Sequence, residues 1–575
     1  MLFVLVLCLA LLAGCAAPPQ APPTVTVVLE QNAAYTADTY VQTVPRGQTV
    51  RFAVQPAEGQ TLIGVDHDAA SLTLTTTGYQ LTLEAPRYST VLSLTARPSG
   101  VTMLCHPNGA PGEAQPVPAA ASHLRFNTPS LLFERPGYTL IGWNTAADGS
   151  GRAIGLGSRA ALDEAAQLYA QWAAWTPAEQ FTYQPTHDGV AITGYTGQGS
   201  TVVVPAELDG QTVTEIAANA FAGANCERVI LSATLRRLAD GAFADCALRE
   251  LTLFDSIQTL SDRAFTGCGA LQTLHLNAVE APVYSGTYYD TFADKYDRLV
   301  TVEGPRLVLF SGSSTRFGYD SDALQAAYPA YHVVNMGVFA YSNALPQMLL
   351  LLDAMQPGDV LIHAPEFDAA QRQFCTKTTV DAAFFNMMEA NYDMIARLDL
   401  RKLDGVFTAL QTYLQTKSTL PPRSYALCAA DFDEDGNPVD SPSYNAYGDY
   451  CLYRPNAADD APVYGLPVDY TAEAFPAAQF LQPLRAVYAQ FAQKGVAVYF
   501  TYAPRNQQAL SEASTPEARA ALDAHLRTGL GVPFLGGIED SLWPGRYLYG
   551  TDNHLSTEGA SLRTAQLIHW LEGRL

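Results

Sequence analysis

The pattern of hydrophobic and polar positions changes several times along the chain, and each change indicates a different kind of structure. Between residues 24 and 98, apolar and polar residues alternate in short runs such as Thr24–Leu29 and Thr49–Val54. Alternation with a period of two is typical of strands that bury one face, and turn residues separate the runs. This stretch therefore predicts a small antiparallel β-sandwich over residues 24–98.

Aromatic residues mark the next segment, residues 99–173. Tyr138 and Trp143 share one predicted strand, Trp172 lies in another, and an Asp-Gly turn separates the two. The segment resembles the Listeria–Bacteroides repeat, a small β-grasp-like module of bacterial surface proteins. The two aromatic side chains of the first strand are candidates for carbohydrate binding, but packing in the core is the favoured alternative.

A 22-residue repeat follows within residues 174–300. Its signature is an Ala-Phe pair, which occurs at Ala220-Phe221, Ala242-Phe243 and Ala264-Phe265. Repeats of this length stack into a solenoid whose turns bury their apolar faces against one another. The pattern resembles the BspA-type leucine-rich repeats of surface proteins. We expect a strand at Thr201–Val204 to cap the stack, and Cys246 and Cys268 to pack in its core rather than bind metal.

Strand and helix patterns alternate from residue 301 to residue 575. The predicted strands are Leu307–Ser311, His332–Asn335, Val360–Ala364, Val496–Tyr502 and Val532–Leu535. The predicted helices are Asp322–Ala327, Leu345–Met355, Phe480–Gln493, Pro516–Arg527 and Thr557–Glu572. This rhythm predicts an α/β domain with a parallel sheet covered on both faces, in which Pro533 confines the fifth strand to an edge. Residues 368–475 interrupt the rhythm and are expected to cap the sheet edge.

The N-terminal residues suggest where the protein acts. Residues 1–14 form an apolar segment that is shorter than a typical transmembrane helix, and the sequence Leu-Ala-Gly-Cys ends at Cys15. This resembles a bacterial lipoprotein signal, which implies cleavage before Cys15, a lipid on its sulfur and a linker over residues 15–23. An ordinary secretory signal is the alternative, and both place the protein outside the cytoplasm.

Charge and cysteine spacing argue against two classes of function. With 56 acidic and 33 basic residues the formal charge is −23, which repels nucleic-acid phosphates. The nine cysteines form no C-x-x-C pair, so no metal site or other cofactor is expected, and Cys428 and Cys451 are candidates for a disulfide. Asp431–Asn437 resembles half of a calcium loop, but Pro442 stands where the loop needs a Glu, so a solvated turn is expected.

The candidate chemistry lies at the two ends of the α/β segment. Ser314 follows the first predicted strand in a Gly-Ser-Ser turn, and Asp552 and His554 precede the last helix. A serine hydroxyl becomes nucleophilic when an imidazole accepts its proton, and a carboxylate can hold that imidazole in the required tautomer. The sequence therefore predicts Ser314 as nucleophile, His554 as base and Asp552 as the orienting acid.

This arrangement resembles the SGNH, or GDSL-like, hydrolase superfamily. The blocks that match are Gly312-Ser313-Ser314, Asn335-Met336-Gly337 and Asp552-Asn553-His554. The resemblance implies a flavodoxin-like domain and an oxyanion hole built from the amides of Ser314 and Gly337. After the third strand, where the family supplies an Asn, this chain has Glu366, which cannot donate a hydrogen bond when ionised. Asn335 or Asn343 is expected to substitute.

These features predict a lipid-anchored, extracytoplasmic serine esterase that removes acyl groups from cell-surface or host glycans. The Asp-x-His spacing also resembles polysaccharide O-acetyltransferases of the alginate-modifying type, so acyl transfer is an open alternative. A third interpretation, favoured by Glu366, is a surface adhesin whose hydrolase-like domain is inactive. The expected partners are an acylated glycan or small ester, the membrane through the lipid, and a protein or carbohydrate ligand of the repeats.

Overall fold

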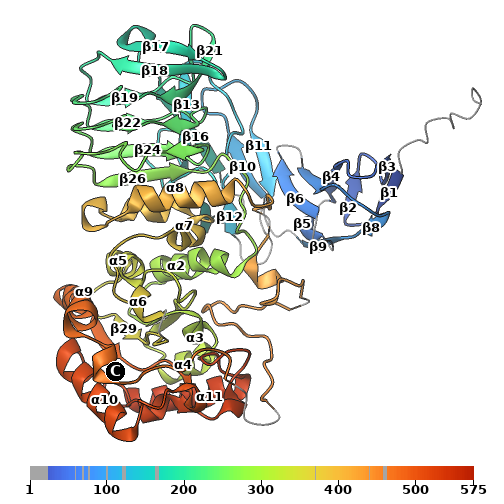
Figure 1. Cartoon of the computed structure of the whole chain (residues 1–575). Helices are drawn as coiled ribbons and strands as arrows, with labels where there is room; N and C mark the ends of the chain where they lie inside the picture. The colour runs from blue at the N-terminus through green and yellow to red at the C-terminus, as the bar shows by residue number, and fades with distance from the viewer. Residues whose placement is uncertain are drawn as a thin grey trace, which may run out of the picture. The chain divides into compact units, whose positions relative to one another are not determined.

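The computed structural model describes residues 24–575 except 58–59, 66, 68–69, 76–77, 99–101, 119–124, 162–166, 369–370, 426, 440 and 458–462 (Figure 1). It separates into two compact units, one ending at Pro98 and one beginning at Ser99. Cys15 and the predicted signal segment lie outside the described residues. Within the described residues, no helix is long and apolar enough to cross a membrane.

The first unit is formed by short strands. They are β1 (Thr24–Leu29), β2 (Tyr35–Ala37), β3 (Val41–Pro45), β4 (Val50–Pro56), β5 (Gln60–Val65), β6 (Ala70–Thr75), β7 (Gly78–Leu83), β8 (Thr90–Leu92) and β9 (Leu94–Pro98). The sheets run β3-β1-β8, β2-β4-β7-β6 and β5-β9. Val50, Phe52 and Val54 alternate into the core as the pattern predicts. The predicted antiparallel pairing is confirmed for most of the described strand pairs, and the exception is β8, which pairs with β1 in parallel.

The second unit begins with a sheet packed on Trp143. Its strands are β10 (Thr102–His106), β11 (Gln115–Pro118), β13 (Tyr138–Asn144), β14 (Ala153–Ile154) and β16 (Gln167–Ala174), in the order β11-β10-β16-β13-β14. Strands β12 (Arg125–Asn127) and β15 (Arg159–Ala161) pair separately. The Trp143 side chain is buried, and its Nε1 donates to the Pro129 carbonyl at 2.9 Å. Trp143 is therefore a core residue, whereas Tyr138 is half-buried.

A solenoid of two sheets follows (Figure 1). One sheet contains β17 (Phe181–Thr186), β18 (Gly189–Tyr195), β20 (Glu207–Leu208), β21 (Gln211–Ile216), β23 (Arg237–Leu238) and β25 (Thr259–Leu260). The other contains β19 (Thr201–Val203), β22 (Arg228–Ile230), β24 (Glu250–Phe254) and β26 (Thr273–Asn277), all paired in parallel. The strand expected at Thr201–Val204 is thus present as β19, and it extends the stack beyond the three evident repeats.

The repeat turns share one backbone conformation. Gly223, Asp245 and Gly267 occupy equivalent positions and have φ values of 68°, 53° and 80°. Gly adopts the left-handed region without strain, and Asp tolerates it better than most residues. The turn chemistry therefore recurs with the same period as the core residues.

Stacked aromatic rings run through the core of the solenoid. The ring centroids of Phe221 and Phe243 are 4.8 Å apart, and those of Phe243 and Phe265 are 5.4 Å apart. The stack ends on Phe407, whose ring lies 4.3 Å from that of Phe265. Phe407 belongs to α8 (Val406–Lys417), a helix within residues 368–475, which are called the insertion below. A helix of the insertion therefore covers the end of the solenoid (Figure 1).

The C-terminal part contains a four-stranded parallel sheet in the order β28-β27-β29-β30. Its strands are β27 (Arg306–Phe310), β28 (His332–Asn335), β29 (Val360–His363) and β30 (Ala497–Phe500). The helices are α2 (Thr291–Thr301), α3 (Ser313–Arg316), α4 (Ser321–Ala327), α5 (Ala344–Ala354), α9 (Gln482–Gln493), α10 (Pro516–Leu530) and α11 (Thr557–Leu571). The first four predicted strands are confirmed. The fifth is reduced to one bridge between Phe500 and Phe534, beside Pro533.

Two apolar cores cover the faces of this sheet. Val308 and Phe310 of β27 pack in the core that contains α5 and α9. Leu307 and Leu309 pack in the other core, together with residues of α4 and α11. Alternate residues of one strand therefore serve opposite faces, which explains why the sequence of β27 is a continuous apolar run. The sheet lies between two helical layers.

The insertion joins the solenoid to this sheet, which is more than the expected cap over a sheet edge. It contains α6 (Gln371–Phe374), α7 (Ala382–Met388) and α8. Nζ of Lys417 lies 2.7 Å from Asp255, just after β24, and 3.1 Å from Glu389, just after α7. Burial acts to lower the pKa of Lys417, but Asp255, Tyr392 and Glu389 outweigh it and raise that pKa well above its ordinary value. A buried ion cluster thus ties the insertion to the solenoid.

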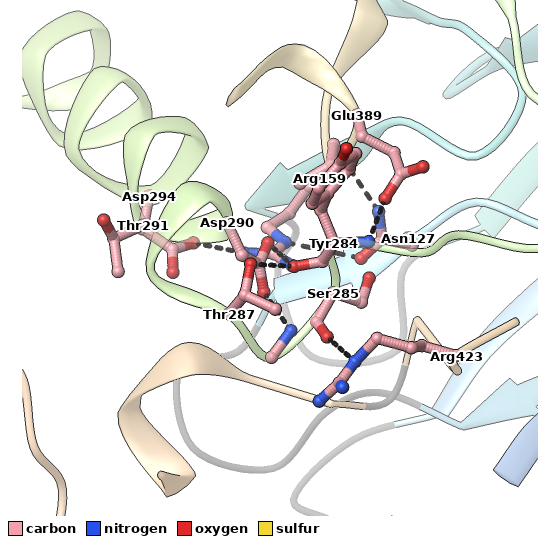
Figure 2. Close-up of polar contacts among 12 residues, drawn as sticks. Asn127, Arg159, Tyr284, Ser285, Thr287, Asp290, Thr291, Asp294, Glu389 and Arg423 are labelled. Carbon is pink, nitrogen blue, oxygen red and sulfur yellow. Dashed lines mark hydrogen bonds and ion pairs between the residues drawn. The ribbon is translucent and has the colours of Figure 1, made fainter. Parts of the chain in front are cut away.

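A second buried polar cluster joins β15, in the segment of residues 99–173, to α2 and to the insertion, as Figure 2 shows. Arg159 of β15 pairs with Asp290 at 2.5 Å and with Asp294 of α2 at 3.0 Å. Glu389 of the insertion accepts a hydrogen bond from the backbone amide of Tyr284 at 2.6 Å. Two segments that are distant in the sequence, β15 and the insertion, are thereby tied to the start of α2 and to the residues that lead into it.

Candidate active site

The candidate site lies at the carboxyl ends of β27 and β29, the edge where open α/β sheets place their ligands. After β27, Gly312 leads directly into α3, which begins at Ser313. After β29, the chain reaches Glu366, whose side chain turns back toward this junction and is 2% exposed. A Cβ at position 312 would clash with Cβ of Ala340 and would lie 2.6 Å from Oε1 of Glu366, so the close approach of both residues requires a glycine there.

His554 is paired with Ser313 and not with Ser314. Oγ of Ser313 lies 2.7 Å from Nε2 of His554, and both side chains are half-buried. Ser314 is completely buried, and its backbone amide donates to Oε1 of Glu366 at 2.8 Å. Successive side chains on a helix point about 100° apart, so only one of the two serines can face the imidazole. The structure therefore places Ser313, and not the expected Ser314, beside the imidazole.

The surroundings of His554 keep its imidazole neutral. Burial, together with the nearby guanidinium groups of Arg316 and Arg454, lowers the pKa of His554 to about 3. The ring stacks on Phe317 with centroids 4.3 Å apart. A neutral imidazole with Nε2 beside a hydroxyl is the form that accepts a proton in general base catalysis.

A short turn presents His554. Oγ1 of Thr551 accepts hydrogen bonds from the backbone amides of Asn553 and His554 at 3.2 Å and 3.0 Å. Ser556 then caps α11, since its Oγ accepts from the backbone amide of Gly559 at 3.1 Å. Small hydroxyl residues at these positions fix the loop through local side chain to backbone bonds.

Asp552 does not bind His554 within the described part of the chain. Oδ2 of Asp552 accepts from the backbone amides of Tyr464 at 3.1 Å and Gly465 at 2.9 Å. Its Oδ1 accepts from the side chain of Asn506 at 3.1 Å. The expected role as orienting acid is therefore wrong for this structure, because the turn at Thr551 directs the carboxylate toward the insertion.

The residues expected to form the oxyanion hole are engaged elsewhere. The amide of Gly337 donates to Oδ1 of Asn335 at 3.0 Å. Nδ2 of Asn335 donates to Asp449 at 2.7 Å and to a carbonyl of α3 at 3.0 Å. Nδ2 of Asn343 donates to the Thr379 carbonyl at 2.6 Å. Gly337 and Asn335 thus hold α3 in place, and Asn343 fastens the insertion, which corrects all three assignments.

Sequence reasoning missed the role of Asn553. Its Nδ2 donates to Oε2 of Glu366 at 3.3 Å, so Glu366 accepts from both Ser314 and Asn553. Burial raises the pKa of Glu366, and the hydrogen bonds from Ser314 and Asn553 partly offset that rise. The available signal was the position of Asn553, between the two residues singled out for catalysis, together with the acid Glu366 after the third strand, where an amide was expected.

Two minor expectations have clear outcomes. Cys428 and Cys451 are both free, the first buried and the second exposed, so the predicted disulfide is wrong. In the calcium-like loop, Oδ1 of Asp433 accepts from the backbone amides of Asp435 and Asn437 at 3.0 Å and 2.8 Å, which forms a turn. Among the described residues, no group of three or more His, Cys, Asp or Glu is arranged to hold a metal ion.

Comparison with known proteins identifies the solenoid. Residues 211–291 match the family described as the BspA type leucine rich repeat region, in six copies. A crystal structure of a leucine-rich repeat protein from T. pallidum is 25% identical over 17% of this chain and 70% of that chain, with a TM-score of 0.13. No curated protein matches the chain. Residues 211–291, from β21 to the residue at which α2 begins, therefore form a BspA-type leucine-rich repeat region.

Proposed function

We propose that the C-terminal domain is a serine acyl esterase of the SGNH type, with Ser313 as nucleophile and His554 as general base. The observation that carries the proposal is the 2.7 Å contact between Oγ of Ser313 and Nε2 of His554. Its position at the carboxyl edge of a parallel sheet, between two helical layers, is where such folds bind ligands. The lowered pKa of His554 keeps the imidazole neutral, which is the form that a general base requires, and it also makes His554 a weak base, since an efficient general base has a pKa near the working pH.

The proposed reaction has two steps. Oγ of Ser313 attacks the ester carbonyl while His554 takes the hydroxyl proton, and the protonated imidazole then gives that proton to the departing alkoxide. Water next attacks the acyl-serine, again losing a proton to His554, and the carboxylic acid leaves as Ser313 regains its proton. Stacking on Phe317 and the turn at Thr551 orient the imidazole in place of a carboxylate.

The insertion carries exposed side chains on the loop that Asp552 binds, two residues before His554 in the sequence. The loop anchored by Asp552 exposes Tyr464, at 55% of its surface, and Leu466, at 83%. Amphipathic aromatic side chains of this kind pack against the apolar face of a sugar ring while their hydroxyls stay in water. This supports an acylated glycan as substrate. The lipoprotein-like leader and the BspA-type repeats support a position at the outer face of a bacterial membrane.

A second function is favoured by the solenoid and by Glu366. Leucine-rich repeats present extended binding surfaces, and the Glu366 carboxylate blocks the amide of Ser314 in this structure. A protein that binds a partner at the cell surface, and whose hydrolase-like domain does not catalyse ester hydrolysis, would have these features. A measurement of ester hydrolysis distinguishes the two functions.

The test is the hydrolysis of p-nitrophenyl acetate by the purified full chain and by two serine variants. Ser313→Ala is expected to lower kcat/KM by about 1,000-fold or more, because no other hydroxyl contacts Nε2 of His554 in the described residues. Ser314→Ala keeps the backbone amide and is expected to cost no more than about tenfold. Equal rates for Ser313→Ala and the unmodified protein would overturn the proposal, and adding a glycan acceptor then distinguishes transfer from hydrolysis.

A further inference from the structure

We infer that the backbone amide of Ser314 and the side-chain amide of Asn553 are the oxyanion-binding donors of this site, and that Glu366 occupies them in the resting protein. The inference rests on the proposed function, since an oxyanion arises only if Ser313 attacks an acyl group. It keeps the amide of Ser314, which the resemblance also implies, and puts the side chain of Asn553 in place of Gly337, Asn335 and Asn343, whose amides are engaged elsewhere.

The two donors are the nearest neighbours of the reacting groups along the chain. Ser314 directly follows the nucleophile, and Asn553 directly precedes the base. Their N–H groups converge on one carboxylate, with Ser314 N at 2.8 Å from Oε1 and Asn553 Nδ2 at 3.3 Å from Oε2. Ser314 N lies within the range of about 2.7–3.1 Å that oxyanion donors keep, and Asn553 Nδ2, which binds the other carboxylate oxygen, lies slightly beyond it. The Glu366 carboxylate thus marks the position of the charge that develops during attack.

The orientation of Asn553 is fixed by an independent contact. Nη1 of Arg505 donates to Oδ1 of Asn553 at 2.9 Å, and the Arg505 side chain is 3% exposed. A guanidinium has donors only, so the amide atom that faces Arg505 must be the oxygen. The NH₂ group of Asn553 is therefore directed at Glu366, where it is available to an oxyanion once the carboxylate leaves.

Gly312 makes this position accessible. A side chain at residue 312 would crowd Ala340 and Oε1 of Glu366, which lies 2.6 Å from an added Cβ. The same space must admit the carbonyl oxygen of an ester bound to Ser313. A charged carboxylate is a stronger acceptor than an ester carbonyl, so Glu366 competes with the substrate and the resting site reacts slowly.

Removal of the carboxylate provides the first test. The rate at which a fluorophosphonate labels Ser313 is measured on the full chain for Glu366→Ala, with the exposed Glu473→Ala as control. Glu366→Ala is expected to label at least about tenfold faster, and the control at the rate of the unmodified protein. Adding Asn553→Ala to Glu366→Ala is expected to lower the rate by about 100-fold, the usual cost of one lost oxyanion donor.

The crystal structure of the phosphonylated, otherwise unmodified protein is the second test, and it does not depend on whether Glu366→Ala folds. The phosphonyl oxygen is expected within hydrogen-bond distance of Ser314 N and Asn553 Nδ2, with the Glu366 carboxylate displaced. Glu366 still bound to both donors beside a phosphonylated Ser313 would overturn the inference while leaving the proposed function intact. Failure to label Ser313 in any variant would overturn both.

Discussion

The solenoid and the candidate site use different means to bring distant residues together. Phe221, Phe243 and Phe265 stack because each occupies the same position in a repeat, so local sequence determines which rings meet. Ser313 and His554 are 241 residues apart, and no periodicity relates them. Their contact depends on two loops, each fixed by its own side-chain hydrogen bonds. A repeat predicts contacts from the sequence, whereas a site built from loops requires the tertiary structure.

The largest expected effect tests the loop-built contact. His554→Ala removes the only base in contact with Ser313 among the described residues, so kcat/KM for p-nitrophenyl acetate is expected to fall by about 1,000-fold or more. His569→Ala, at an exposed position of α11, is the matched control and is expected to keep full activity. Retained activity in His554→Ala would mean that the contact is structural.

A core substitution tests the repeat-built contact. Phe243→Ala removes a fully buried ring with a neighbour on each side, so the free energy of unfolding is expected to fall by about 4 kcal/mol. Phe407→Ala, at the half-buried end of the stack, is expected to cost about half as much. Urea denaturation of both variants measures the difference. Equal losses would show that α8 contributes as much to the stack as an internal repeat.

The buried ion cluster tests how firmly the two regions are joined. Lys417→Met leaves Asp255 and Glu389 buried without their cation, which is expected to lower the free energy of unfolding by about 3 kcal/mol. Replacing both acids as well, with Asp255→Asn and Glu389→Gln, is expected to recover part of that loss. A Lys417→Met protein as stable as the unmodified one would argue against a charged cluster.

A smaller effect is expected at Asp552. Because Asp552 binds the loop at Tyr464 and Gly465 and not the imidazole, Asp552→Asn is expected to change kcat for p-nitrophenyl acetate by less than about tenfold. An acid that orients a catalytic imidazole costs about 10⁴-fold when replaced by its amide. A loss of that size would restore the triad expected from the sequence.

The smallest expected effect is that of pH on the rate of ester hydrolysis. An ordinary histidine gains a proton near pH 6.5, which would halve the fraction of active base there. Since the pKa of His554 is lowered to about 3, its imidazole stays neutral as the pH falls, and the base remains available. The rate of hydrolysis is therefore expected not to fall between about pH 7 and about pH 5. Loss of half the activity near pH 6.5 would contradict this.

Sequence patterns were sufficient where periodicity or turn chemistry determines structure. They predicted the solenoid, the four parallel strands β27–β30 and the helices α4, α5, α9, α10 and α11, because each of these elements carries its own apolar pattern, but they did not predict α2 or α3. Pro533 correctly limited the fifth strand to a bridge. They did not predict that the insertion also packs against the solenoid, since the ring contact of Phe407 with Phe265 forms only in the folded chain.

The details of the site were beyond such patterns for physical reasons. Ser313 and Ser314 are chemically identical, and only the rotation of the short helix α3 decides which one faces His554. Asn335 looked free to donate, yet its amide is taken by Asp449, which is 114 residues away in the insertion. Adjacent, equivalent residues and long-range hydrogen bonds leave no periodic trace in a sequence.

The most direct test of the central claim is to locate the covalent adduct. The full chain is treated with a fluorophosphonate, digested, and analysed by tandem mass spectrometry to identify the modified residue. Because Oγ of Ser313 contacts Nε2 of His554 and Ser314 is completely buried, the adduct is expected on Ser313 and is expected to be absent from His554→Ala. An adduct on Ser314, or none on either serine, would contradict the account.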